Sequence, residues 1–287
     1  MLDLDVVIPV HNAPDHVRAC LDSVEAALRG RGTLILVDDA SDEPTRTLLD
    51  ERAAATGATL VRHVERTGYT KAVNDGARAG RRRNVMFLNS DTIVPPRALD
   101  RLSTALDRHR RLAVVGPLSN AASLQSVPST SGTGVANQTA INPLPPGVTP
   151  ADLDAMFARR RWGALTYAPL VHGFCFTVKR AAFEQLGGFD EETFADGYGE
   201  ENDFSFRAVD AGYRLGILTN TYIFHAKSAS YQDAVRVPLL ARSAERLDAR
   251  HGPERLQRAS AELQANVPLA RAREMAAAFY AAHTAAV

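Results

Sequence analysis

Cysteine, net charge and long apolar runs are all scarce in this sequence. Only two cysteines, Cys20 and Cys175, occur among 287 residues, so neither a disulfide framework nor a cysteine metal site is expected, and the predicted compartment is reducing. Basic and acidic side chains number 33 each, which leaves no net charge to attract nucleic acid or an anionic membrane. No stretch approaches the roughly 18 apolar residues of a membrane span.

The N-terminus also lacks the pattern of a signal peptide, because residues 1–5 include two aspartates and lead directly into an expected strand. We predict a cytoplasmic location and leave open a peripheral position at the inner face of a membrane. The arginine triplets at 81–83 and 159–161 are interpreted as solvated surface, with binding of phosphate or an acidic acceptor as the alternative.

Short β-branched runs alternate with amphipathic segments in the first half of the chain. Strands are expected at 4–10, 33–37, 60–63 and 85–88, and helices at 14–29, 43–56 and 71–79. This order predicts an α/β fold with a Rossmann-like, mostly parallel central sheet flanked by helices.

The second half of the chain has a weaker pattern. No charged residue occurs from Leu112 through Ala151, and 126–150 is expected to be either a lid or acceptor-binding loop or simply disordered. Further strands are expected at 113–116, 171–178, 214–218 and 222–225, and helices at 151–161, 180–186 and 204–211. We predict one domain over 1–235 and a C-terminal helical extension over 236–287, which offers a surface for a homodimer.

Acidic residues follow two of the expected strands. Asp38 and Asp39 come after the second strand, and Asn89-Ser90-Asp91 follows the fourth. The carboxyl ends of strands in such sheets line the crevice where ligands bind. Asp91 is a candidate ligand of a divalent cation that bridges phosphates, and Asp38 or Asp39 a candidate for binding a base or ribose. The alternative for each is a helix cap.

The densest polar run is Gly197-Tyr198-Gly199-Glu200-Glu201-Asn202-Asp203. Two glycines let the backbone approach a ligand, and one carboxylate could accept the proton of an attacking hydroxyl. The alternative is a charged turn that caps a helix at Phe204. His225 follows an apolar strand and is either a metal ligand or a structural residue. His172 and His63 are expected to be structural.

Taken in order, these segments resemble the inverting family 2 glycosyltransferases of the GT-A fold, in particular their rhamnosyltransferase-like members. The resemblance covers residues 4–230. The matching residues are Val7-Ile8-Pro9-Val10-His11-Asn12, Val37-Asp38-Asp39-Ala40-Ser41, Gly68 with Asn74 and Gly76, Asn89-Ser90-Asp91-Thr92, Gly187-Gly188-Phe189-Asp190-Glu191, Gly199-Glu200-Glu201-Asn202-Asp203-Phe204, and His225.

The resemblance implies a role for each matching position. The implied nucleotide-binding residues are Pro9, His11, Asn12, Asp38, Asp39, Gly68, Asn74 and Ser90, the implied metal ligands are Asp91 and His225, and the implied general base is Glu201, with Glu200 as its alternative. Residues 1–116 would form the nucleotide-sugar half and 117–235 the acceptor half. Asn89 replaces the first acid of the family's metal motif, so the cation, Mn²⁺ or Mg²⁺, is expected to bind with the help of the nucleotide.

The implied reaction is a single in-line displacement that inverts the anomeric centre. The expected donor is a dTDP- or UDP-sugar, and the acceptor a glycan, a lipid-linked glycan or a small molecule. Two other classes were weighed. A sugar-nucleotide nucleotidylyltransferase would need a glycine-rich, basic loop after the first strand, which residues 10–14 do not supply. A non-catalytic nucleotide- or carbohydrate-binding module would not need both Asp91 and Glu201.

Overall fold

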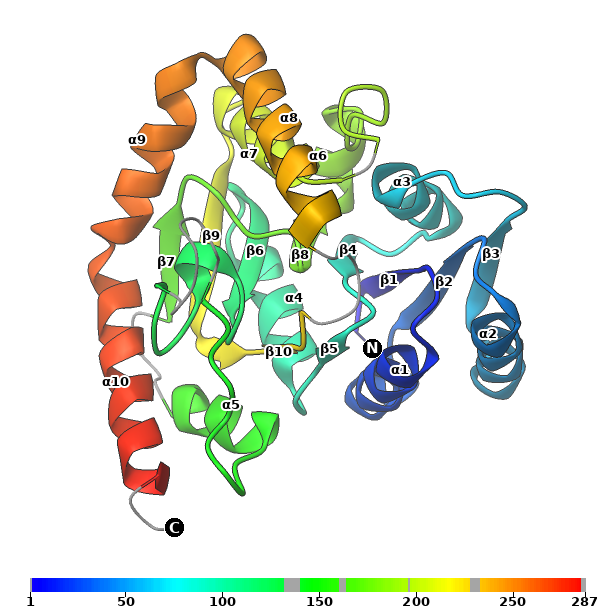
Figure 1. Ribbon diagram of the computed structural model, residues 1–287, viewed down its shortest axis with the longest axis horizontal. Helices are drawn as coiled ribbons and strands as arrows, with labels where there is room; N and C mark the ends of the chain where they lie inside the picture. The colour runs from blue at the N-terminus through cyan, green and yellow to red at the C-terminus, as the bar shows by residue number, and fades with distance from the viewer. Residues whose placement is uncertain (1, 132–139, 160–163, 196, 228–232, 285–287) are drawn as a thin grey trace.

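The computed structural model describes residues 2–131, 140–159, 164–195, 197–227 and 233–284, and its centre is a mixed sheet with helices on both faces (Figure 1). The sheet has eight strands in the order β3-β2-β1-β4-β8-β6-β9-β7. These strands are β1 (Leu4–Val10), β2 (Thr33–Asp39), β3 (Thr59–His63), β4 (Asn84–Leu88), β6 (Leu112–Leu118), β7 (Leu165–Ala168), β8 (Cys175–Lys179) and β9 (Arg214–Tyr222). Strands β5 (Thr92–Ile93) and β10 (Phe224–His225) form a separate antiparallel ribbon.

The helices of the main body cover the sheet in two layers. They are α1 (Pro14–Leu28), α2 (Glu43–Thr56), α3 (Tyr69–Ala79), α4 (Ala98–Arg108), the short 3₁₀ helix η1 (Ser123–Gln125), α5 (Pro150–Ala158), α6 (Arg180–Gln185) and α7 (Glu200–Asp210). Successive side chains of a strand point to opposite faces. Val6 of β1 therefore packs in the core beneath α1 and α4, whereas Val7 packs in the core beneath α3, α6 and α7.

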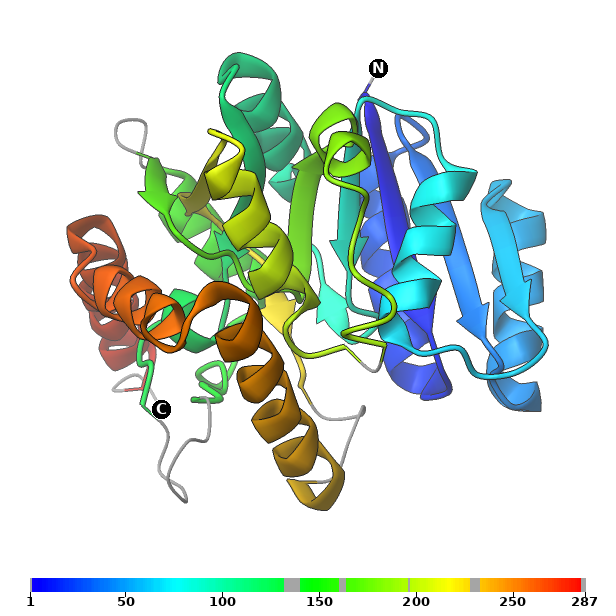
Figure 2. The same cartoon turned by 90° about the horizontal axis from the view of Figure 1, so that it is seen from above.

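The parallel half of the sheet agrees with the sequence prediction. Strands β1 to β4 and helices α1 to α3 lie within a few residues of their expected bounds, and the pairs β1–β2, β1–β4 and β2–β3 are parallel. Gly76 allows α3 to lie directly on the sheet, because a Cβ atom there would stand 2.3 Å from Cγ1 of Val7. Figure 2 shows β1, β2 and β3 pointing the same way, so their carboxyl ends share one edge.

Several boundaries in the second half differ from the prediction. The strand expected at 171–178 begins only at Cys175, because the amide of Phe174 donates to Nδ1 of His172 (3.1 Å) in a tight turn. The two strands expected at 214–218 and 222–225 are instead the long β9 followed by the short β10, since Thr219 and Thr221 continue the strand as β-branched residues readily do. β7 was not predicted.

Helix boundaries also differ. The helix expected from Phe204 begins at Glu200, where Gly199 takes a positive φ of 122° and three acids occupy the first turn. Acidic side chains are favourable there because the amino end of a helix carries partial positive charge. The helix expected at 151–161 runs from Pro150 to Ala158. Residues 132–139 of the expected lid and 160–161 of an arginine triplet lie outside the described residues, so both predictions stay open.

The expected C-terminal helical extension is present as α8 (Asp233–His251), α9 (Pro253–Gln264) and α10 (Val267–Thr284). Figure 1 shows α9 and α10 along the outer side of β7, and Figure 2 shows the first turns of α8 extending past the carboxyl ends of the parallel strands. Leu263 and Leu269 share a core with Ile217 of β9. Within the described parts of the chain, no helix is long and apolar enough to cross a membrane.

Candidate active site

Asp91 and His225 are brought together by the ribbon of β5 and β10. Thr92 pairs with His225 across this ribbon, and the amide of Ala226 donates to the carbonyl of Asp91 (2.9 Å). Both side chains are buried, and Nε2 of His225 lies 3.3 Å from Oδ1 of Asp91. Two candidate ligands from distant parts of the sequence therefore meet at one point.

The hydrogen bonds of the His225 ring define its tautomer. Nδ1 lies 2.8 Å from the carbonyl oxygen of Ala121, which can only accept, so Nδ1 carries a proton. In the neutral ring, the lone pair of Nε2 then faces the carboxylate of Asp91 and the amide of Asn89, which is 3.5 Å away. Two electron-rich atoms at 3.3 Å favour a cation between them, either a proton or a metal ion.

Asn120 fixes the backbone beneath this ring, although nothing in the sequence singled it out. Its side-chain oxygen accepts from the amide of His225 (2.8 Å), and its NH₂ group donates to the carbonyl of the same residue (3.0 Å). A backbone carbonyl that binds the second nitrogen of a histidine is a common support for a metal ligand. Asn120 and Ala121 together supply that support.

The helix-cap alternative for Asp91 is not what the structure shows. Helix α4 begins at Ala98 after Arg97, whereas the motif turn is closed by Thr92, whose hydroxyl donates to the carbonyl of Asn89 (2.9 Å). Burial raises the pKa of Asp91, but the neighbouring His225 outweighs it and holds the pKa below the ordinary value of 3.8. Asp91 is therefore an anion at neutral pH.

The donor set fits a divalent cation that needs further ligands from its substrate. Among the described residues, no group of three or more His, Cys, Asp or Glu side chains is placed to hold a metal ion. Asp91 supplies a carboxylate oxygen, which both Mn²⁺ and Mg²⁺ prefer, and His225 supplies an imidazole nitrogen, which suits a transition-metal ion such as Mn²⁺ better than Mg²⁺. Their 3.3 Å separation suits two ligands of one ion, whose bonds to each are about 2.0–2.2 Å long.

Glu200 and Glu201 occupy the first turn of α7. Glu201 is half-buried, and its Oε2 accepts from the amide of Gly199 (3.1 Å). Glu200 is buried, and its Oε2 has no hydrogen-bond partner. Of the two, Glu201 has the greater access to a substrate.

Both glutamates hold their protons more tightly than an ordinary glutamate. Burial raises the pKa of Glu200 well above 4.5, and the charge of Glu201 raises it further. Burial also raises the pKa of Glu201, although the amide of Gly199 opposes this. The pair titrates as one system. A carboxylate with a raised pKa is better suited to accept a proton in a reaction at neutral pH.

The segment His172-Gly173-Phe174 joins Glu201 to the Asp91–His225 pair. The ring of Phe174 stacks on His225 with centroids 5.1 Å apart, and its carbonyl accepts from the amide of Asn89 (2.9 Å). Gly173 is a neighbour of Glu201, because a Cβ atom at Gly173 would lie in ordinary van der Waals contact with Cγ of Glu201, at 3.4 Å. The candidate base and the candidate metal ligands therefore flank a single three-residue segment.

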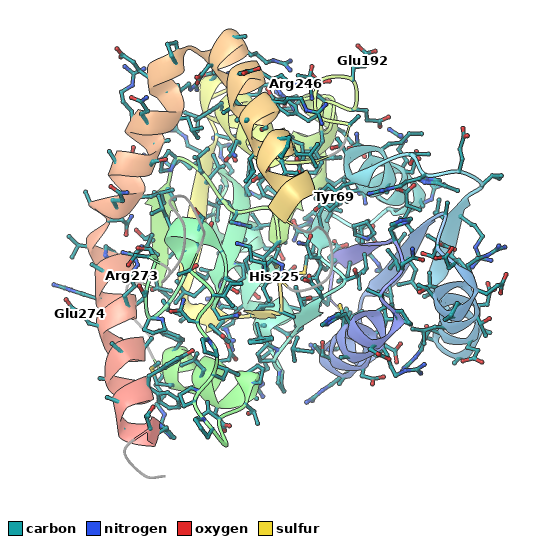
Figure 3. The ribbon with its side chains drawn as sticks, viewed as in Figure 1. Tyr69, Glu192, His225, Arg246, Arg273 and Glu274 are labelled. Carbon is teal, nitrogen blue, oxygen red and sulfur yellow. The ribbon has the colours of Figure 1, made fainter. Side chains whose placement is uncertain are left out.

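Tyr69, the first residue of α3, completes this side of the site. Its pKa lies well above 10.0, because of burial and then the negative charges of Glu200 and Glu201. Gly197 also packs against its side chain. Figure 3 shows Tyr69 and His225 near the centre of the view, away from the outline of the molecule.

Asp38 and Asp39 are more constrained than the sequence suggested. Asp38 is fully buried and binds the amide of Ser41 (2.9 Å) and Nε of Arg62 (2.9 Å), so both its oxygens have structural partners. Oδ1 of Asp39 accepts from Thr67, and its Oδ2 accepts from the amide of Gly68 (3.0 Å). Neither aspartate caps α2, which follows Asp42.

The remaining nucleotide-binding candidates fall into two groups. Asn12 lies on the loop after β1 and accepts from the amide of Asp42 (2.7 Å), beside His11, whose Nδ1 is bonded to the carbonyl of Asp39 (2.8 Å). Pro9 and Ser90 are half-buried at the ends of β1 and β4. Asn74, in contrast, donates hydrogen bonds from its NH₂ group to the carbonyl of Phe189 (2.9 Å) and to the carboxylate of Glu191.

These contacts favour a supporting role for Asn74 rather than direct nucleotide binding. Its side-chain oxygen also accepts from the amide of Phe189 (3.2 Å), so each polar atom of the amide binds the turn at 187–191. Gly68 begins α3 with a φ of 92° and binds Asp39 through its amide. Of the predicted nucleotide set, the residues around Asp39, His11 and Asn12 therefore form one connected surface.

Asp203 fixes the C-terminal extension to the helix that carries the glutamates. Its fully buried carboxylate binds Nε of Arg207 (2.8 Å) and Nε2 of His251 (2.8 Å) at the end of α8. Ser243 of α8 lies against Gly199, where a Cβ atom would stand 2.2 Å from its Oγ. The sequence offered no signal for this contact, because His251 lies 48 residues beyond Asp203.

The arrangement of the sheet and its flanking helices is that of the GT-A fold. A mixed sheet, a polar turn after β4, an acidic first turn on α7 and a histidine after β9 meet at the carboxyl edge of the parallel strands. The family model for glycosyl transferase family 2 matches residues 5–187, and the chain belongs to that family. This membership favours glycosyl transfer over nucleotidyl transfer or a purely binding role.

Relatives and solved structures agree with this assignment. The chain is 26% identical over 253 residues to N-acetylglucosaminyl-diphospho-decaprenol L-rhamnosyltransferase of Mycobacterium tuberculosis, covering 79% of this chain and 77% of that protein. The mannosyltransferase PcManGT of Pyrobaculum calidifontis, in complex with GDP-Man and Mn²⁺, has a TM-score of 0.61 at 22% identity, over 99% of this chain and 76% of that one. GalNAc-T7 with UDP, GalNAc and Mn²⁺ has a TM-score of 0.64 at 18% identity, over 96% and 54% of the two chains.

Asp203→Asn is expected to destabilise the protein by about 3 kcal/mol, because it removes one partner of a buried charge cluster. Asp210→Asn is the matched control, since Asp210 also joins α7 to the extension, through Arg255, but is 57% exposed. Its cost should stay below about 1 kcal/mol. Urea unfolding followed by circular dichroism measures both. Equal costs for the two variants would contradict the role of Asp203.

Glu200→Gln is expected to gain stability relative to the wild type as pH rises. The raised pKa of Glu200 means that the folded state keeps a proton that the unfolded state releases near 4.5. This contribution to stability is therefore complete below about pH 4.5 and is lost as pH rises toward the folded-state pKa. Melting temperatures from pH 5 to 8 should show a gap of a few degrees opening in favour of Glu200→Gln. A gap independent of pH would refute this, and the exposed Glu192→Gln serves as control.

Proposed function

We propose that this protein is an inverting glycosyltransferase that moves a sugar from a nucleoside diphosphate-sugar to an acceptor hydroxyl, with Glu201 as the general base. The observation that carries the proposal is the position of Glu201 and the Asp91–His225 pair on either side of residues 172–174. A displacement at an anomeric carbon needs a base near the attacking oxygen and a positive charge near the leaving diphosphate. The two clusters match these two needs.

Glu201 is the better choice of base for two reasons. It is half-buried and faces Gly173, which has no side chain to block an approaching hydroxyl. Glu200 is buried, and its Oε2 has no hydrogen-bond partner, so it is less accessible to an acceptor hydroxyl than Glu201 is. In this proposal, Glu201 removes the proton of the acceptor hydroxyl as that oxygen attacks, and the anomeric configuration inverts because a single displacement occurs.

Asp91 and His225 would hold the divalent cation. When bound, Mn²⁺ or Mg²⁺ would stabilise the charge of the leaving diphosphate. Asp91 contributes a carboxylate that is ionised at neutral pH, and His225 contributes Nε2, which the hydrogen bond from Nδ1 to Ala121 leaves free to act as a ligand. Because the described residues supply only these two ligands, with Asn89 beside them, we propose that the cation binds together with the nucleotide.

The relatives guide the choice of donor and acceptor. The mycobacterial relative is a rhamnosyltransferase that acts on a lipid-linked N-acetylglucosaminyl diphosphate, which supports a deoxyhexose donor and a lipid-linked acceptor here. The solved structures hold GDP-Man or UDP, so they do not point to a single nucleobase for the donor. A dTDP- or UDP-sugar remains our proposed donor, and a glycan, lipid-linked glycan or small molecule the acceptor.

Asp91→Asn is expected to require at least about 10-fold more Mn²⁺ for half-maximal donor hydrolysis or transfer, because a neutral amide is a weaker ligand than a carboxylate. Thermal-shift titration of Mn²⁺ with and without UDP or dTDP gives a readout independent of turnover. The wild type should bind the ion mainly when the nucleotide is present. Strong binding of Mn²⁺ without nucleotide, or an unchanged requirement in Asp91→Asn, would disprove this site.

Glu201→Gln is expected to lower kcat by at least about 100-fold, because the amide cannot accept the acceptor's proton. Binding of the nucleotide diphosphate with Mn²⁺ should not change, as calorimetry would show. Glu192→Gln, an exposed carboxylate that Figure 3 shows at the surface, is the control and should keep full activity. Normal turnover by Glu201→Gln would transfer the role of base to another group.

A further inference from the structure

His172 has one polar atom without a partner, and this atom lies at the junction of the two catalytic clusters. Nδ1 accepts from the amide of Phe174 (3.1 Å), so the proton of the neutral ring sits on Nε2. Nε2 has no hydrogen-bond partner among the described residues. It also differs from the fully buried polar atoms without a partner, such as Oε2 of Glu200, because it is not completely enclosed. His172 is half-buried, so Nε2–H is a donor that the described residues leave unused and that a ligand can reach.

The ring is held in place from several directions. The backbone amide of His172 donates to the side chain of Gln125 (2.6 Å), and that buried glutamine is itself bonded to the carbonyl of Pro117 at the end of β6 (2.8 Å). The ring packs edge-on against Phe174 and His225, with centroids 5.7 and 6.5 Å away. Little conformational freedom is left to lose when a ligand binds, which strengthens any hydrogen bond that Nε2 makes.

The neighbours of His172 define what Nε2 can meet. On one side is His225, the proposed ligand of the cation that binds the diphosphate. On the other side, through Gly173, is Glu201, the proposed base. In a displacement reaction, the transferred sugar lies between the leaving diphosphate and the attacking hydroxyl. A donor placed between the two clusters therefore faces the sugar.

The charge state of the ring also favours a hydroxyl over a phosphate. A second proton on Nδ1 would break the bond from the amide of Phe174, so the ring is held neutral. A neutral imidazole adds no charge beside a diphosphate, but it is well suited to bind an uncharged oxygen. We propose that Nε2–H of His172 donates a hydrogen bond to a hydroxyl of the transferred sugar and so positions the anomeric carbon; this inference rests on the proposed function.

Two substitutions separate the structural bond of His172 from the proposed substrate bond. His172→Asn offers an oxygen near Nδ1, which can accept from Phe174, but has no donor where Nε2 stands. His172→Gln is longer and can place its NH₂ group near Nε2. The control is His109→Asn, because His109 is exposed at the end of α4.

The measurement is the dissociation constant of a nucleotide sugar divided by that of its own nucleotide diphosphate, with Mn²⁺. The probes are UDP-glucose, dTDP-rhamnose and GDP-mannose. Each is compared with its own diphosphate, which is UDP, dTDP or GDP respectively. In His172→Asn this ratio should rise about 10-fold for the sugar that the wild type binds, as expected for the loss of one hydrogen bond. Binding of the diphosphate and the melting temperature should stay at wild-type values, and His172→Gln should recover most of the loss.

Several outcomes would overturn the inference. An unchanged ratio in His172→Asn would show that Nε2 does not contact the sugar. If the affinity for the diphosphate fell as much as the affinity for the nucleotide sugar, Nε2 would be assigned to the leaving group instead. An unchanged ratio with slower transfer would assign it to the acceptor. Failure of the wild type to bind any of these nucleotides would instead refute the proposed function, and the inference would fall with it.

Discussion

The short ribbon between β5 and β10 is the constraint on which the site depends. It joins Thr92 to His225, although 132 residues lie between these two positions in the sequence. Without this pairing, the turn after β4 that carries Asp91 would not be held beside His225, which follows β9. Two hydrogen bonds between Asn120 and the backbone of His225 make so short a ribbon specific, since a two-residue pairing alone is marginal.

A second constraint is the cost of gathering carboxylates at one edge of the sheet. Asp91, Glu200 and Glu201 all lie near the place where an anionic diphosphate is proposed to bind, and like charges oppose one another there. Two features of the structure reduce this repulsion. Asp91 is paired with His225, whereas burial and the charge of Glu201 raise the pKa of Glu200 well above 4.5, which opposes the build-up of negative charge at this edge.

The sequence predicted the parallel half of the fold well, because each strand there is a continuous apolar run and each helix has a clear periodicity. The later boundaries failed where local signals conflict with tertiary contacts. The two strands expected at 214–218 and 222–225 leave out Thr219 and Thr221, although both residues continue β9. Residues 171–174 look like a strand, but the ring of His172 accepts a backbone amide and ends the pairing.

The same distinction applies to the site. Asp91, Glu201 and His225 follow recognisable strands or glycines, so their candidacy was visible from the sequence. Asn120 and His172 were not, because each acquires its role from a partner that only the fold supplies. Asn120 meets His225 across 105 positions, and His172 meets that ring only after β8 pairs with β4. Supporting residues of this kind lack a sequence signal, since their chemistry depends on distance rather than on residue type.

The contact between α7 and the C-terminal extension adds a mechanical link to this chemical arrangement. The match to the family ends at residue 187. Beyond it, Ser243 lies beside Gly199 at the start of α7, and His251 binds Asp203 in the first turn of that helix. The position of Glu201 between these two contacts therefore depends on α8 as much as on the sheet. In the proposal that Glu201 is the base, about 1 Å of misplacement could cost about 100-fold in rate, so the proposal makes the position of α8 part of the catalytic requirement.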